Sequence, residues 1–127
     1  MSHRILIVED NPLNSELLQD WLETEGYAVA TATTLDEAKA ELNGVTPEAV
    51  LLDVQLGVED GLTLAMAIRS DPRLSNLPII AVTAHAMITD QQRVMDAGCD
   101  ASVSKPIDFD VLREKLQAFI SDPSYRV

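Results

Sequence analysis

The sequence predicts an α/β fold, a doubly wound parallel sheet of five strands with five helices. Short apolar runs of strand length alternate along the chain with longer segments of helical period. The runs show no polar alternation, as expected of strands that helices cover on both faces. Four runs end at a charged or hydroxyl residue, and the ends of parallel strands share one edge of a sheet.

The strands are expected at the apolar runs. The clearest run, 49–52, is entirely apolar and ends at Asp53. Pro78 stands just before the fourth run, where a proline costs no ladder hydrogen bond. The expected strands are residues 4–8, 27–32, 49–52, 79–82 and 101–104.

Capping residues and glycines mark the helices between these strands. The first helix opens at Asn11 and Pro12, a polar cap followed by proline in the first turn, and Gly26 ends it. Thr34 and Glu37 form a candidate capping box for the second helix. The expected helices are residues 12–25, 35–43, 62–70, 87–97 and 108–120.

Size and composition indicate one domain with an aliphatic core. The 127 residues suit a single domain, which we expect at 1–121, with a tail or linker stub at 122–127. Hydrophobic residues make up 46% and aromatic residues 4%, so Val, Ile, Leu and Ala must form most of the core. We expect Leu17 on the first helix, and Val111 and Phe119 on the last, to point into it.

The charge and the hydropathy pattern exclude some classes of protein. The formal charge of −12 argues against a nucleic-acid-binding protein, which needs a basic face. The sequence has no signal-peptide pattern and no long apolar stretch. We therefore expect a soluble, cytoplasmic protein with no membrane partner.

Residues at the strand ends form a candidate site. Glu9 and Asp10 follow the first strand, Asp53 ends the third, Thr83 the fourth and Lys105 the fifth. Gathered carboxylates repel one another, and Mg²⁺, which prefers oxygen ligands, would relieve that repulsion. A carboxylate can attack phosphorus to form an aspartyl phosphate. Lys105 would then neutralise one phosphoryl oxygen, and Thr83 would donate a hydrogen bond to another.

Each of these residues alone has a simpler interpretation. Asp10 or Asn11 can cap the first helix while Glu9 lies in solvent, and Asp53 can cap a loop. Lys105 alone is more often a surface charge. The combination favours a phosphoryl site, because the simpler interpretation requires separate coincidences at matching strand ends.

Several short motifs carry a family likeness, in a fixed order along the chain. They are Ile5-Leu6-Ile7-Val8-Glu9-Asp10-Asn11, Leu51-Leu52-Asp53, Asp60-Gly61, Val82-Thr83-Ala84 and Ser104-Lys105-Pro106. With these motifs the chain resembles the receiver domains of two-component response regulators, most closely single-domain receivers and those attached to hybrid kinases. The resemblance implies a flavodoxin-like fold with strand order 2-1-3-4-5.

The resemblance also implies residue roles. Asp53 would accept a phosphoryl group from a phosphohistidine of a sensor histidine kinase or a histidine phosphotransfer protein. Asp10 and Asp53 would ligate Mg²⁺ together with the backbone carbonyl of Gln55, and Glu9 would act through water. The protein would be a phosphorylation-dependent switch rather than an enzyme, catalysing only its own phosphorylation and dephosphorylation.

The resemblance also implies a surface for binding a partner protein, formed by the fourth helix, the fifth strand and the last helix. Ala84, His85, Ser102 and Pro106 are the residues expected to switch or to meet a downstream protein there. Ser102 stands where many receivers carry Tyr or Phe, and Gly57 where many carry proline. The protein would act as a monomer or a weak homodimer.

Other functions remain open from the sequence. A receiver-like interaction module that is never phosphorylated is one alternative, and Ser102 favours it. A phosphatase with an aspartyl-phosphate intermediate would need a second Asp two residues after Asp53, where Gln55 stands. A flavodoxin-like electron carrier is disfavoured because Glu9 and Asp10 would repel the flavin phosphate.

Overall fold

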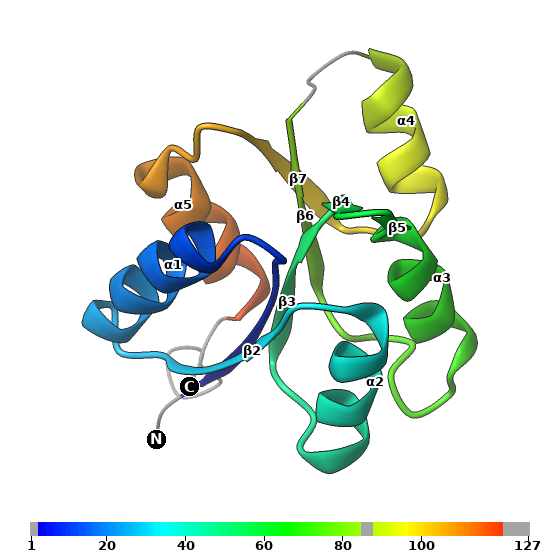
Figure 1. Ribbon diagram of the computed structural model, residues 1–127, viewed down its shortest axis with the longest axis horizontal. Helices are drawn as coiled ribbons and strands as arrows, with labels where there is room; N and C mark the ends of the chain where they lie inside the picture. Colours follow the sequence, from blue (N-terminus) through cyan, green and yellow to red (C-terminus); the bar gives the residue numbers. More distant parts are fainter. Residues whose placement is uncertain (1–2, 85–87, 121–127) are drawn as a thin grey trace.

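Figure 1 shows the computed structural model of the chain, which describes residues 3–84 and 88–120. Its centre is a five-stranded parallel sheet in the order β2-β1-β3-β6-β7. Because β4 and β5 form a separate pair, β6 and β7 are the fourth and fifth strands of the main sheet. The observed order is therefore the predicted order 2-1-3-4-5. The strands are β1 (Arg4–Val8), β2 (Ala28–Ala32), β3 (Ala49–Asp53), β4 (Gln55–Leu56), β5 (Glu59–Asp60), β6 (Ile79–Thr83) and β7 (Ala101–Ser104).

The described residues form five helices, which cover both faces of the sheet. In Figure 1, α1 and α5 lie on one face, and α2, α3 and α4 on the other. This is the predicted doubly wound arrangement. None of the helices in the described part of the chain has both the length and the apolar character that a membrane span requires. The helices are α1 (Pro12–Thr24), α2 (Leu35–Gly44), α3 (Leu62–Ser70), α4 (Ile88–Asp96) and α5 (Phe109–Phe119).

The core consists of two aliphatic clusters, one on each face of the sheet. Successive side chains of a strand point to opposite faces, so β1, β3 and β6 supply both clusters. Every residue of β3 is buried, as its continuous apolar run predicted. Burying each Leu or Ile of these strands contributes about 1.5–3 kcal/mol to folding. The central strands are therefore a rigid support for the residues at their ends.

Three side chains predicted in the core are exposed, and that prediction was wrong. Leu17 is 57% exposed, Val111 39% and Phe119 37%. Each lies one position before a buried residue of the same helix or its end, a step of about 100° around the axis. A helix on a sheet buries only a stripe, so an apolar neighbour beside that stripe stays in solvent. The buried neighbours are Leu18, Leu112 and Ile120.

The helix caps were mostly predicted. Asn11 caps α1, where its side chain accepts two backbone N–H bonds at 2.9 and 3.2 Å. Thr34 caps α2 by accepting a bond from the N–H of Glu37 at 3.1 Å. In a capping box the Glu37 carboxylate would accept from the backbone N–H of Thr34. Here it accepts instead from both the N–H and the hydroxyl of Thr33. The Asn11 cap fixes the direction in which the chain leaves β1.

The segment between β3 and α3 contains a small hairpin that the sequence did not predict. Antiparallel pairing of β4 with β5 sets Leu56 opposite Glu59 and leaves Gly57 and Val58 in the turn. Gly57 has a φ of +58°, which proline cannot adopt because its ring fixes φ near about −65°. A positive φ at the first turn residue alone is typical of a type II′ hairpin turn. The glycine therefore permits this hairpin where a proline would not.

Candidate functional site

Strand pairing brings the predicted site residues to one edge of the sheet. In the β3–β6 pair, Asp53 lies opposite Val82, next to Thr83. In the β6–β7 pair, the backbone N–H of Lys105 donates to the carbonyl of Thr83 at 2.8 Å. Glu9 directly follows β1, and β1 pairs with β3 on the side of β3 opposite to β6. These residues come from separate parts of the chain and meet because the strands are parallel.

Three carboxylates form a cluster at this edge. Glu9, Asp10 and Asp53 each present an oxygen, and these oxygens all lie within 4.8 Å of one another. Glu9 is 3% exposed and Asp53 4% exposed, whereas Asp10 is open to solvent. Buried carboxylates this close disfavour their own ionisation unless a cation or hydrogen-bond donors compensate.

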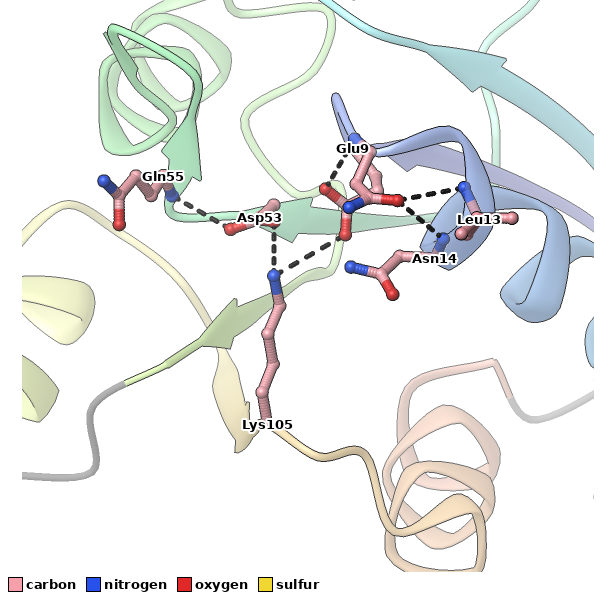
Figure 2. A network of polar contacts seen from close by, with 7 residues as sticks. Glu9, Leu13, Asn14, Asp53, Gln55 and Lys105 are labelled. Atoms are coloured by element: carbon pink, nitrogen blue, oxygen red, sulfur yellow. Dashed lines mark hydrogen bonds and ion pairs between the residues drawn. The ribbon is translucent and has the colours of Figure 1, made fainter.

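Lys105 supplies one compensating charge, as Figure 2 shows. Its Nζ donates to Oδ2 of Asp53 at 2.7 Å and lies 3.6 Å from Oε1 of Glu9. The other oxygen of Asp53, Oδ1, accepts from the backbone N–H of Gln55 at 2.9 Å. Oε2 of Glu9 accepts from the backbone N–H of Asn11 at 3.2 Å. Each buried carboxylate is therefore oriented by one backbone N–H and by the ammonium group.

The charges of the cluster follow from these contacts. Burial raises the pKa of Glu9 to about 7, and the adjacent Asp53 adds to the rise, while the Asn11 N–H and Lys105 oppose it. Burial alone would lower the pKa of Lys105, but its contacts with Asp53 and Glu9 outweigh burial and raise the pKa. Lys105 is thus cationic at neutral pH, and Glu9 changes its charge near neutrality.

We expect the metal-free protein to lose stability as the pH rises from 4.5, the ordinary pKa of Glu9, towards 7. In this window the folded chain holds the Glu9 proton more tightly than the unfolded chain does, so stability falls as the proton is lost. The loss should be about 1–3 kcal/mol. Urea unfolding in EDTA across this range measures it. Glu9→Gln should flatten this part of the profile, and an unchanged slope in that variant would contradict the assignment.

The donor set fits a hard divalent cation. Carboxylate and carbonyl oxygens are the ligands that Mg²⁺ prefers, and the ion keeps several of its waters. Asp10 offers a solvent-facing oxygen beside the buried Asp53. The bond from the Gln55 N–H to Asp53 also holds the backbone of Gln55 against the cluster. These positions are compatible with an ion that is partly held by protein and partly hydrated.

A cleft of about 270 Å³ opens beside Asp53. The ends of β3 and β6, the β4–β5 hairpin and α4 form its walls, and Thr83 and Ala84 line it. Asp60 on β5 and Arg93 on α4 also line it, and Nη2 of Arg93 lies 3.2 Å from Oδ2 of Asp60. No local pattern in the sequence indicates this pair, because its members are 33 positions apart and on different elements.

A second hollow, of about 200 Å³, lies between α1 and the segment that follows β7. Glu9 and Lys105 form its polar side, and Leu17 and Pro106 its apolar side. Asn14 also lines it, and Figure 2 shows the Asn14 amide directed toward Lys105. Sequence reasoning missed Asn14, since a polar residue in the first turn of a helix is ordinary. Its position in the helical turn directly after Glu9 and Asp10 could have indicated that it lies near the site.

Some of the predicted residues meet at the carboxylate cluster, and the others lie apart from it. Ala84 is exposed in the cleft, and Pro106 is exposed in the hollow beside α1. Ser102 is half-buried on β7, with its side chain on the α4 face because its neighbour Val103 packs under α5. His85 lies outside the described residues. The residues that meet there are Glu9, Asp10, Asp53, Thr83 and Lys105.

The fold and the site together define a class of domain. It is a doubly wound domain whose strand ends hold an acidic cluster and an ammonium group, suited to a divalent cation beside a phosphoryl group.

Comparisons with known proteins agree with this class. The family model described as response regulator receiver domain matches residues 5–117. The polar-differentiation response regulator DivK of Brucella ovis is 35% identical over 122 residues, 96% of this chain and 99% of that protein. The chain therefore belongs to the response regulator receiver family of two-component signalling, whose members are signalling switches.

Solved structures extend the likeness to receivers attached to kinases. The receiver domain of the sensor histidine kinase PA1611 from Pseudomonas aeruginosa PAO1 superposes with a TM-score of 0.87 at 31% identity, covering 96% of this chain and 100% of that one. That structure is described with a magnesium ion coordinated in the active site cleft. The receiver domain of a signal transduction histidine kinase from Syntrophus aciditrophicus also gives 0.87, at 30% identity, covering 94% and 91%.

Proposed function

We propose that this protein is a phosphorylation-dependent switch that accepts a phosphoryl group on Asp53. The observation that carries the proposal is the Asp53 carboxylate, which is buried, held by the Gln55 N–H and Lys105, and adjacent to Asp10. The donor would be a phosphohistidine of a histidine kinase or a histidine phosphotransfer protein. The receiver domain would span residues 1–121, with 122–127 as a tail, in a cytoplasmic protein.

The residues of the site suit this reaction. A carboxylate oxygen of Asp53 attacks phosphorus, the new O–P bond forms, and the P–N bond breaks with its electron pair leaving on the imidazole nitrogen. Mg²⁺ held by Asp10, Asp53 and the Gln55 carbonyl, with Glu9 acting through water, would neutralise charge on the phosphoryl oxygens. Lys105 already contacts Asp53, so its ammonium can transfer to a phosphoryl oxygen with little movement. The Thr83 hydroxyl would contact another oxygen.

The signal would be a change of protein contacts near the site. Lys105 would exchange the Asp53 carboxylate for the phosphoryl group, which alters the segment after β6 and the end of β7. The Ser102 side chain is too small to fill the space beside Thr83 that an aromatic ring would fill. Switching would therefore depend on Ala84 and His85, and a downstream protein would read the face of α4, β7 and α5. The protein would catalyse only its own phosphorylation and dephosphorylation, as a monomer or weak homodimer.

Incubation with Mg²⁺ and acetyl phosphate, followed by intact mass measurement, tests the proposal. We expect a single phosphoryl adduct that disappears in EDTA and in Asp53→Asn. Asparagine keeps the size and the hydrogen-bonding oxygen of the side chain but is not a phosphate acceptor.

Beryllofluoride, a stable mimic of the phosphoryl group, separates a short-lived adduct from an absent one. Mg²⁺-dependent beryllofluoride binding that is lost in Asp53→Asn would support the proposal even if the adduct hydrolyses too quickly to observe. Failure of both tests would contradict phosphorylation and favour a receiver-like module that acts by binding alone.

A further inference from the structure

The cleft beside Asp53 contains a cation that the proposed reaction does not use. Among the described residues that line the cleft, Arg93 is the positively charged one, and the acidic residues Asp53, Glu59 and Asp60 line the same cleft. Its Nη2 is 3.2 Å from Oδ2 of Asp60, and this ion pair joins α4 to the hairpin beside the cleft.

This ion pair holds Arg93 only weakly. The side chain of Arg93 is 56% exposed and that of Asp60 51% exposed, and exposed pairs contribute little because water and salt screen them. Asp60 also has a separate structural contact, since its Oδ1 accepts at 3.0 Å from the backbone N–H of Leu62, the first residue of α3. The guanidinium group can therefore turn toward an anion in the cleft while Asp60 keeps its bond to the Leu62 N–H.

We propose that Arg93 and Asp60 determine which phosphodonors the site prefers, an inference that rests on the proposed phosphorylation of Asp53. A donor that reaches Asp53 through the cleft must place its leaving group in or near this space. The positive Arg93 favours a leaving group that departs with negative charge, and the negative Asp60 opposes it. The two residues thus act in opposite directions on the same reaction.

Two small donors differ in this charge. With acetyl phosphate, the bond from phosphorus to the acetyl oxygen breaks, and its electron pair leaves on acetate, which carries negative charge. With phosphoramidate, nitrogen is already protonated as an ammonium group, the P–N bond breaks, and neutral ammonia leaves. In both reactions the Asp53 oxygen forms the new bond to phosphorus. Arg93 should therefore favour acetyl phosphate and disfavour phosphoramidate.

The experiment measures the rate of Asp53 phosphorylation with each donor in Mg²⁺, by intact mass, at low ionic strength. Arg93→Gln should lower the ratio of the acetyl phosphate rate to the phosphoramidate rate by about threefold, the size expected of one exposed charge. Asp60→Asn should raise the ratio by a similar factor, because it removes the negative charge, while asparagine keeps the oxygen that accepts from the Leu62 N–H. Arg93→Lys should retain the wild-type ratio, and salt should weaken every difference.

Arg73→Gln is the matched control, because it removes the same charge from an arginine that pairs with Asp71 outside the cleft. It should leave the ratio unchanged. Equal ratios in wild type, Arg93→Gln and Asp60→Asn would overturn the inference, and so would an equal shift in Arg73→Gln. If neither donor nor beryllofluoride modifies the wild type, the proposed function itself fails and takes this inference with it.

Discussion

Gly61→Ala is expected to disrupt both the stability of the domain and the phosphorylation of Asp53. A Cβ built on Gly61 would lie 3.1 Å from both the carbonyl carbon of Asp53 and the oxygen of Val54, and closer still to the oxygen of Asp53. These are backbone atoms of the β3 end, so they cannot yield as a flexible side chain does. Forcing them apart should cost about 3 kcal/mol of unfolding free energy.

The same displacement moves Asp53, the proposed phosphoacceptor. Asp53 would leave its contacts with Lys105 and the Gln55 N–H, and a misplacement of about 1 Å can slow a reaction about a hundredfold. Urea unfolding and the rate of adduct formation from acetyl phosphate measure the two effects. Gly44→Ala is the control, because a Cβ on Gly44 meets nothing within 4 Å. A Gly61→Ala variant as stable and as fast as wild type would contradict the packing described here.

Lys105→Gln is expected to change phosphorylation and magnesium affinity in opposite directions. The Lys105 ammonium lies 2.7 Å from Asp53 and 3.6 Å from Glu9, so it balances the charge of the cluster and would stabilise charge on the phosphoryl group. Without it, adduct formation should slow by about 10²–10³-fold, as when a transition-state donor is removed. Mg²⁺ should bind about tenfold more tightly, because the cluster becomes more negative.

Calorimetric titration with Mg²⁺ and adduct formation from acetyl phosphate measure the two quantities. Lys39→Gln, on the exposed surface of α2, makes the same change of net charge away from the site and should affect neither. Weaker Mg²⁺ binding in Lys105→Gln would show that the lysine supports the metal site rather than competing with it. An unchanged rate of phosphorylation would show that Lys105 takes no part in the reaction.

Much of the fold could be predicted because the signals are local. The apolar runs place β1, β3 and β6, and the caps and glycines place the helix ends. Parallel strands share an edge, so the gathering of Glu9, Asp53 and Lys105 followed from their positions at strand ends. The family motifs then gave the strand order that the sheet shows.

The remaining features depend on tertiary contacts that local patterns do not encode. The hairpin at 55–60 requires the turn at Gly57, and neither strand is long enough to show a period. Whether Leu17 is buried depends on the angle at which α1 packs on the sheet, not on its own apolar character. The pair of Arg93 and Asp60 forms only once α4 and the hairpin are folded on either side of the cleft.

Chemical mapping of the adduct tests whether Asp53 is the phosphoacceptor. Borohydride reduces an acyl phosphate to an alcohol, so a phosphorylated aspartate becomes homoserine and can be located by peptide mass spectrometry. After treatment with acetyl phosphate and Mg²⁺, we predict homoserine at position 53 alone, and none when EDTA is present. Homoserine at another position, or an adduct that persists in Asp53→Asn, would contradict phosphorylation of Asp53.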